Sequence, residues 1–221
     1  MRKVIGLLGA LTAAGALIGL VPGGASGAST YVCTRGLMPG SYPHVHVPAG
    51  AICRSNGGVT VSGGVSIAAG ATFVLGTDQG GGGSGGGLTS TIVGGVRALN
   101  AANVQIHSTI IFGGLSVEGG SGPFGGPFGI TWNAIEDNHI IGGATVEGYS
   151  GFWFGFIRNL VRGDVNLNNN VVVDEDGNEY VTNAIIGNLN CSGNSPAPQI
   201  GDSEGKPNRV TGLKTGQCVN V

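Results

Sequence analysis

The sequence has little charge and few aromatic residues. Of its 221 residues only 10% are charged and 6% are aromatic, and the formal net charge is −2. Charge this sparse excludes a disordered polyelectrolyte and a coiled coil held together by ion pairs. The chain also lacks the basic excess through which proteins are drawn to nucleic acid. We therefore expect a folded protein with no nucleic-acid partner.

Helical patterns are missing as well. Beyond the first 28 residues, no stretch shows apolar residues sustained at a 3.6-residue spacing. Gly occupies 46 positions, and each Gly inside a helix costs about 1 kcal/mol relative to Ala. These Gly residues also lack the strict three-residue period of collagen. The remaining interpretation is an all-β protein.

The first 28 residues have the layout of a secretory signal peptide. Arg2 and Lys3 precede an apolar run at residues 4–21, and small residues precede a cleavage position after Ala28. A membrane anchor is the alternative, because about 18 apolar residues can just span a bilayer. The run is rich in Gly and Ala, and no second run follows. We expect cleavage and export, with no transmembrane anchor left in the mature chain.

Four cysteines follow the signal, in two pairs near the two ends. An exported chain favours disulfides, and four cysteines allow three connectivities. We favour pairing between sequence neighbours, Cys33 with Cys53 and Cys191 with Cys218, because it closes each end separately. Zinc is the alternative, but no Cys-x-x-Cys occurs, and the histidines do not bracket the cysteines at ligand spacing. We expect no metal and no other cofactor.

A seven-residue word with a central Gly recurs along the chain. Full copies begin at Val61, Ile92, Ile111, Ile140, Val161 and Ile185. Positions −2, +2 and +4 relative to this Gly are apolar in every full copy, so they face one side of an extended chain. The Gly itself marks a bend or a close backbone approach. Position −4 is Ser, Thr or Asn in six of seven copies, counting a truncated copy at Val210. Asn tolerates left-handed corners and can hydrogen-bond from one coil to the next.

The spacing of this word predicts a β-solenoid. The base period is about 20 residues, and longer gaps contain insertions. The insertions lie at 80–87, 120–129, 174–179 and 195–207. We expect an all-β, right-handed parallel β-helix with disulfide-closed ends. Within the single domain 29–221, we assign an N-terminal cap to 29–58, repeats to 59–191 and a C-terminal cap to 192–221. An antiparallel β-sandwich is the alternative, but it does not explain a near-constant period.

The C-terminal stretch carries a resemblance to known proteins. Residues 187–198, 208–212 and 216–218 are similar to small exported β-solenoid repeat proteins of actinobacteria. At the level of the fold, the chain also resembles right-handed parallel β-helix proteins. These resemblances imply export and the solenoid fold, and they carry no catalytic residue.

Two glutamates form the first candidate site. Position +5 of the word predicts that Glu118 and Glu147 lie in register on neighbouring coils. Paired carboxylates about 5 Å apart can hold a cation, or can act as the two carboxylates of a retaining glycosidase. Each Glu also precedes Gly, so the favoured interpretation is a pair of solvated turn residues.

The second candidate site is a segment rich in aromatic residues. We assign a candidate binding patch to Phe124, Phe128, Trp132, Phe152, Trp153, Phe154 and Phe156. Aromatic faces stack on sugar rings and anchor protein interfaces. The alternative is that the segment packs against the wall of the solenoid.

No catalytic motif accompanies these candidates. The sequence contains neither a G-x-S-x-G elbow nor the Lys-Ser/Thr of a phosphate loop. We favour a non-enzymatic structural or interaction protein, secreted or held at the cell surface. Its candidate partners are a cell-wall or extracellular glycan and another surface protein. The alternative is a carbohydrate-binding or polysaccharide-cleaving β-helix protein.

Overall fold

The computed structural model describes residues 29–77, 89–122, 132–201 and 205–221. These residues form short β-strands in three sheets, followed by a single 3-10 helix, η1 (Gln217–Asn220). The predicted signal peptide and the Gly run 80–87 lie outside the described residues, as does most of the insertion 120–129. Within the described ranges, no helix is long and apolar enough to cross a membrane.

Sheet A is the largest of the three. In spatial order it contains β1 (Thr30–Val32), β3 (His44–Val47), β6 (Val65–Ile67), β9 (Val96–Ala101), β12 (Leu115–Gly120), β15 (Ala144–Gly151), β18 (Val165–Asn168), β22 (Leu189–Ser192) and β24 (Lys214–Gly216). The short strand β19 (Val171–Val172) pairs with the far end of β15.

Sheets B and C complete each coil. Sheet B contains β4 (Ile52–Ser55), β7 (Thr72–Leu75), β10 (Asn103–His107), β13 (Trp132–Glu136), β16 (Trp153–Ile157) and β20 (Glu179–Val181). Sheet C contains β2 (Gly40–Tyr42), β5 (Val59–Val61), β8 (Ser90–Val93), β11 (Thr109–Phe112), β14 (His139–Ile141), β17 (Leu160–Arg162), β21 (Ala184–Ile186) and β23 (Arg209–Val210).

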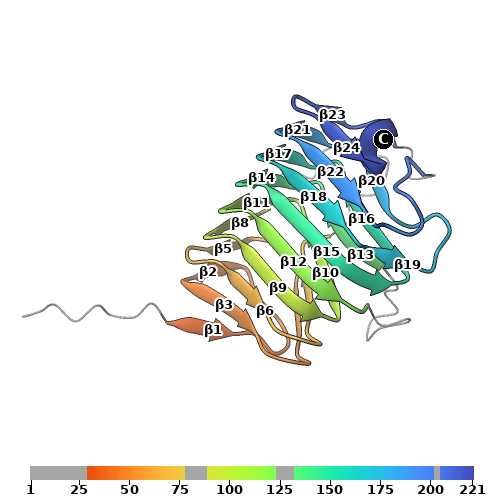
Figure 1. Cartoon of the computed structure of the whole chain (residues 1–221). Helices are drawn as coiled ribbons and strands as arrows, with labels where there is room; N and C mark the ends of the chain where they lie inside the picture. The colour runs from red at the N-terminus through yellow and green to blue at the C-terminus, as the bar shows by residue number, and fades with distance from the viewer. Residues whose placement is uncertain (1–28, 78–88, 123–131, 202–204) are drawn as a thin grey trace, which may run out of the picture.

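The chain winds through the sheets in the order C, A, B and then begins the next coil. Figure 1 shows the strands of successive coils stacked as rungs from β1 to β24. All pairings between these described strands are parallel, and they follow the spacing of the repeated word: Val45 pairs with Val65, and Val96 with Leu115. The predicted parallel β-helix is confirmed, and the antiparallel sandwich is excluded. Both predicted caps contribute strands to the same sheets.

The predicted row of core residues is also confirmed. Ile111, Ile140, Val161 and Ile185 are in register on neighbouring strands of sheet C. All four are almost completely buried, with no more than 1% of their surface exposed. Apolar side chains stacked in this way bury a continuous aliphatic ladder along the axis, which is how a solenoid forms its core.

Backbone contact between coils explains the Gly from which the positions of the word are counted. At the corner from sheet C to sheet A, this Gly in the third copy, Gly113, has a φ of 93°. A Cβ on Gly113 would lie 2.9 Å from the backbone nitrogen of Gly95 in the preceding coil. A side chain would therefore clash with the backbone of the neighbouring coil, in a conformation that L-residues rarely adopt.

The corner from sheet B to sheet C corrects one expectation about Asn. In four of the copies the left-handed residue is the one before position −4, as at Asp137 (φ 58°) and Arg158 (φ 55°), and not the residue at position −4 itself. The Asn that follows is buried, and its side chain bonds to the neighbouring coils. The predicted coil-to-coil hydrogen bonds of Asn are thus confirmed, whereas its predicted backbone conformation is wrong.

Both predicted disulfides are present. Cys33 is bonded to Cys53 in the first coils, and Cys191 to Cys218 in the last, with Cα–Cα distances of 5.5 Å and 5.3 Å. All four cysteines are buried. Each bridge therefore ties a terminal segment to the coil on which it stacks.

Candidate functional site

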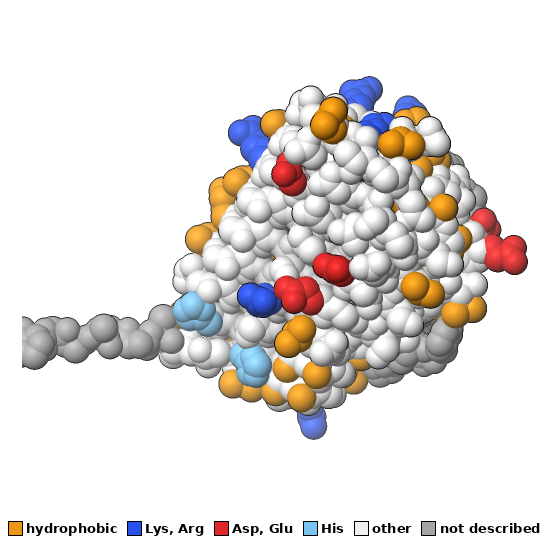
Figure 2. Space-filling model, in the orientation of Figure 1, with side chains coloured by type: hydrophobic (Ala, Val, Ile, Leu, Met, Phe, Trp, Pro, Cys, Tyr) orange, Lys and Arg blue, Asp and Glu red, His pale blue; other side chains and the backbone are white. Residues whose placement is uncertain are grey.

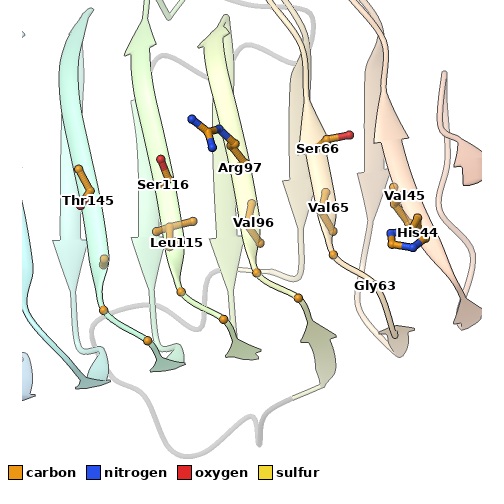
Figure 3. A pocket seen from close by; sticks show the side chains of 18 of the residues that line it. His44, Val45, Gly63, Val65, Ser66, Val96, Arg97, Leu115, Ser116 and Thr145 are labelled. Atoms are coloured by element: carbon orange, nitrogen blue, oxygen red, sulfur yellow. The ribbon is translucent and has the colours of Figure 1, made fainter.

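A groove runs along the corner between sheets C and A. Its volume is about 770 Å³, and it extends from His44 to Asp164. Figure 3 shows it crossing the beginnings of successive sheet A strands, with Ser66, Arg97, Ser116 and Thr145 above it. The groove follows the axis of the solenoid, so it passes over several coils.

The floor of the groove is glycine backbone. It consists of four consecutive pairs: Gly63 and Gly64, Gly94 and Gly95, Gly113 and Gly114, and Gly142 and Gly143. The second Gly of each pair has a positive φ, and a Cβ there would lie within 3.0 Å of a carbonyl oxygen in the next coil. Stacking therefore keeps side chains out of this corner in four successive coils, where the first Gly of each pair is exposed or half-buried and the second is buried.

Side chains close the groove at both ends. At the N-terminal end, the ring of His44 occupies the space that a side chain on Gly63 would need. At the C-terminal end, Asp164 and Asn188 stand where earlier coils have the second Gly. The backbone amide of Asn188 donates to Oδ1 of Asp164 at 2.8 Å, and its side-chain amide donates to the same oxygen at 3.1 Å.

The sheet A wall of the groove carries one outward side chain from each coil. In register these are Ser66, Arg97, Ser116, Thr145 and Asn166, the ladder that position +3 of the word predicts. All except Arg97 are uncharged, and neighbouring members are about 4.8 Å apart. Such a wall offers evenly spaced hydroxyl and amide groups to an extended polar chain.

The two candidate glutamates lie beside this wall in direct register on β12 and β15. Oε1 of Glu118 accepts a hydrogen bond from Ser116 at 2.8 Å and forms an ion pair at 3.4 Å with Arg97, on the preceding coil. Oε1 of Glu147 accepts a hydrogen bond at 3.2 Å from Asn169, on the following coil. The two carboxylates thus engage partners on opposite sides, which reduces their mutual repulsion.

The aromatic patch needs a correction. Phe154 and Phe156 belong to the buried core, with 2% and 0% of their surface exposed, so they offer no face to a partner. The reason is the two-residue alternation of β16, which directs both side chains inward. The ring of Phe154 packs 5.6 Å from that of Tyr180, measured between centroids.

The other members of the patch are less buried or are not described. Phe152 and Trp153 are half-buried. Phe124 and Phe128 lie outside the described residues, and for Trp132 only the backbone, within β13, is described. A binding role for these five residues stays a prediction.

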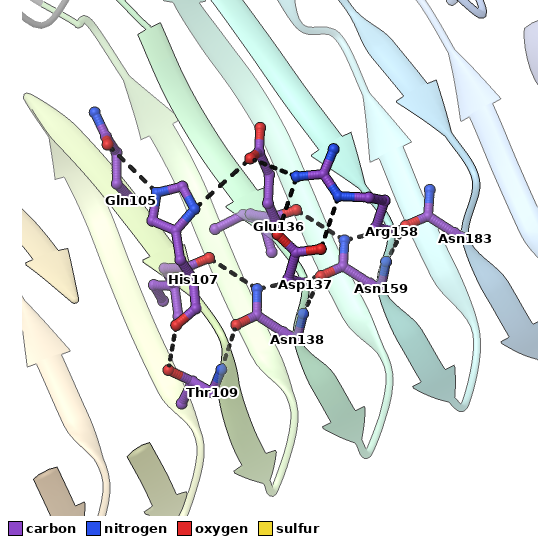
Figure 4. Close-up of polar contacts among 11 residues, drawn as sticks. Gln105, His107, Thr109, Glu136, Asp137, Asn138, Arg158, Asn159 and Asn183 are labelled. Carbon is purple, nitrogen blue, oxygen red and sulfur yellow. Dashed lines mark hydrogen bonds and ion pairs between the residues drawn. The ribbon is translucent and has the colours of Figure 1, made fainter. Parts of the chain in front are cut away.

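Sequence reasoning missed a charged cluster on sheet B. Arg158 bonds to both carboxylate oxygens of Asp137, at 2.7 and 2.9 Å, and its Nη2 lies 3.3 Å from Oε2 of Glu136. Figure 4 shows His107 approaching the same Glu136 oxygen, 3.7 Å away. The sequence signal that could have revealed this cluster is its position, because each of these residues lies one or two residues before position −4 of the repeated word. The cluster joins three neighbouring coils, and His107 and Glu136 are buried.

Comparison with known proteins adds no function to this geometry. No protein-family model, no curated protein and no solved structure matches the chain. The parallel strands stacked in three sheets agree with the resemblance to β-helix proteins. The resemblance to exported actinobacterial repeat proteins stays a prediction.

Proposed function

We propose that the chain is a non-enzymatic interaction protein of the cell exterior and that it binds an extended partner in the glycine-floored groove. The observation that carries the proposal is the continuity of this groove over four coils. Each coil adds one Gly pair to the floor and one polar side chain to the wall. A partner lying along the axis would meet the same contacts repeatedly, at about 4.8 Å intervals.

The disulfides support a location outside the cytosol. Bridges at both ends persist in oxidising compartments, whereas cytosolic thiols are kept reduced. Secretion through cleavage after Ala28 remains part of the proposal. Disulfides that hold both ends of the solenoid in place suit a protein that stays folded outside the cell.

A carbohydrate is the partner class that the lining favours. The sheet A wall presents serine and threonine hydroxyls, asparagine amides and one guanidinium, groups that hydrogen-bond to hydroxyl-rich polymers. Cleavage is the less favoured version of this alternative. In that version the glutamates in register beside the wall, Glu118 and Glu147, would carry the reaction.

The test is a binding screen with soluble glycans and isolated cell-wall polymers. The informative variant is Ser116→Trp, because Ser116 lies midway along the wall and a large side chain there would obstruct the groove. We expect it to weaken binding more than tenfold. The matched control is Ser150→Trp, on the exposed part of β15 beyond the groove, which should bind as the unmodified chain does.

Three results would count against the proposal. The first is that no polymer binds. The second is that Ser116→Trp binds normally. The third is that both tryptophan variants lose binding equally. Release of soluble sugars that Glu118→Gln and Glu147→Gln each abolish would replace the non-enzymatic interpretation with the cleaving one.

A further inference from the structure

The outer face of sheet C is apolar along most of its length. Four of its outward side chains remain well exposed: Val93 (43%), Phe112 (40%), Leu160 (36%) and Ile186 (50%). Ile110, Ile141 and Ala184 lie between them in register and are half-buried. These seven residues, the sheet C face, form a continuous ribbon from β8 to β21.

This face breaks the pattern of an ordinary solvent-exposed sheet. In β11, the inward Ile111 is flanked by the outward Ile110 and Phe112, so both sides of the strand are apolar. Parallel strands that are apolar on both sides are typical of sheets covered on both faces. Here the inner side is covered by the core, and the outer side is exposed. Sheet A, by contrast, presents polar residues such as Ser116 and Thr145 outward.

The charged side chains on the strands of the sheet C face are basic, and the nearest carboxylates, Asp137 and Asp164, lie at the corners beyond the strand ends. Arg162 and Arg209 are exposed on its C-terminal strands, and His139 lies in its centre. None of the described strand residues of sheet C is Asp or Glu. Other acidic side chains lie on another face: Figure 2 shows red carboxylates over sheet A, where Glu118 and Glu147 lie. The partner of the sheet C face should therefore be apolar and anionic.

The size of the face argues against a second copy of the chain. Five strands from β8 to β21, about 4.8 Å apart and three to four residues wide, give a ribbon of roughly 300 Å². A stable protein interface needs about 800 Å² from each partner. Two such faces would also bring the exposed arginines of two copies, Arg162 and Arg209, close to one another. A bilayer sets no minimum contact area, and its binding gains both from apolar burial and from basic residues near anionic headgroups.

We propose that the sheet C face docks on an anionic lipid bilayer. Phe112 and its aliphatic neighbours enter the boundary between headgroups and acyl chains, and Arg162 and Arg209 contact lipid phosphates. The floor of the groove begins at the residues after Val93, Phe112 and Ile141 and so borders this face, whereas the wall of the groove and the two carboxylates lie on sheet A. It gives the proposed exported protein, whose described residues include no helix able to span a membrane, a means of staying at the cell surface.

The test is co-sedimentation of the full chain with vesicles of phosphatidylglycerol or of phosphatidylcholine. We expect the unmodified chain to prefer the anionic vesicles and to lose this preference in high salt. Phe112→Ser should lower partitioning about tenfold, and Arg162→Gln about fivefold. The matched controls lie on sheet A: Leu99→Ser removes an exposed apolar side chain, and Arg97→Gln an exposed charge. Both should partition like the unmodified chain.

The comparison between faces decides the outcome. The apolar run at residues 4–21 is present in every variant, so its own lipid affinity cancels. The proposal is overturned when the sheet C variants partition like the unmodified chain, or when the sheet A variants lose as much. Melting temperatures show whether a variant has unfolded. If one of the two sheet C variants unfolds, vesicle partitioning of the other, Phe112→Ser or Arg162→Gln, tests the proposal. A dimer in sedimentation that Phe112→Ser dissociates, without vesicle binding, would assign the face to a second copy.

Discussion

Buried asparagines hold neighbouring coils together through their side chains. Oδ1 of Asn159 accepts from the backbone amide of Asn138, while its Nδ2 donates to the carbonyl of Ile135 and to Oδ1 of Asn183. A second ladder occurs at the corner between sheets A and B, where the backbone amide of Asn170 donates to Oδ1 of Asn194. The chain bends sharply at both corners, and an Asn side chain satisfies backbone groups that no strand can pair.

Asn159→Ala tests this role. The substitution leaves the amide of Asn138 and the carbonyl of Ile135 buried without their partner, and each such loss costs about 1–3 kcal/mol. We expect urea denaturation to show a loss of about 2–5 kcal/mol. The matched control is Asn166→Ala on the half-exposed face, where one bond from Asn190 is lost and water can replace it. A loss below about 1 kcal/mol for both variants would contradict the ladder's importance.

Tyr149 predicts a response to alkaline pH. Its hydroxyl accepts a hydrogen bond from Asn133 at 2.8 Å, and burial raises the pKa of Tyr149 to about 12. In the unfolded chain a tyrosine ionises near pH 10, so this stabilisation is complete below pH 10 and is lost as the pH rises to about 12. Two pKa units correspond to about 2–3 kcal/mol. Burial also raises the pKa of Tyr180, which adds to the loss.

The measurement is the free energy of unfolding between neutral pH and about pH 12. Tyr149→Phe should lower stability at neutral pH, because Asn133 loses its acceptor, and should give a shallower decline above pH 10. An equally steep decline in both proteins would show that Tyr149 does not titrate as its burial requires.

At the scale of a strand, alternation decides which residues serve the core and which remain outside. Ile140 and Ile141 are neighbours in β14, yet Ile140 is fully buried and Ile141 is half-buried on the sheet C face. The same alternation directs Phe154 and Phe156 of β16 inward. In the repeated word, this alternation predicts the core row correctly. In the aromatic segment, the same alternation places Phe154 and Phe156 in the core, so these two residues do not belong to an exposed patch.

Ile140→Asp and Ile141→Asp form a matched pair for this alternation. An aspartate at position 140 would be an unpaired charge in the core, which costs several kcal/mol, so the domain should unfold. At position 141 the charge remains in contact with water, and we expect a loss of about 1 kcal/mol or less. Thermal melting of both variants distinguishes them. A soluble, stably folded Ile140→Asp protein would rule out the observed register.

At the scale of the molecule, the solenoid is a linear stack in which each coil contacts only its neighbours. Stability in such a stack is close to a sum over coils and their interfaces, and the terminal coils have one neighbour fewer. Both disulfides lie in these terminal coils, and both pairs are separated by roughly one coil of sequence: 20 residues for the first and 27 for the second. They restrain the positions where fraying begins.

Removing the first bridge by Cys33→Ser with Cys53→Ser should cost about 3 kcal/mol, the chain-entropy value for a loop of this size. We expect hydrogen exchange to accelerate in the first coils and to stay slow around Ile140. The variant with Cys191→Ser and Cys218→Ser should show the same effect at the other end. Uniformly faster exchange along the chain would contradict independent fraying of the two ends.

The sequence by itself determined the all-β class, the parallel stacking, the core row and the disulfide pairing. The stacking and the core row depend on a period that every coil repeats, and this period can be read without knowing how far each corner bends. The all-β class follows from the missing helical pattern, and the disulfide pairing from two cysteines near each end. The register of Glu118 with Glu147 followed from the same count.

Only the tertiary structure decided what the outer surfaces present. The groove exists because the backbones of neighbouring coils meet closely at four successive corners and exclude side chains there. The partners of Glu118 and Glu147 come from coils on opposite sides, which sequence spacing alone does not specify. The sheet C face is exposed because no described segment covers it, although its apolar strands read like those of a fully buried sheet. Burial depends on what the rest of the chain covers, and so a local pattern determines the direction of a side chain but not its surroundings.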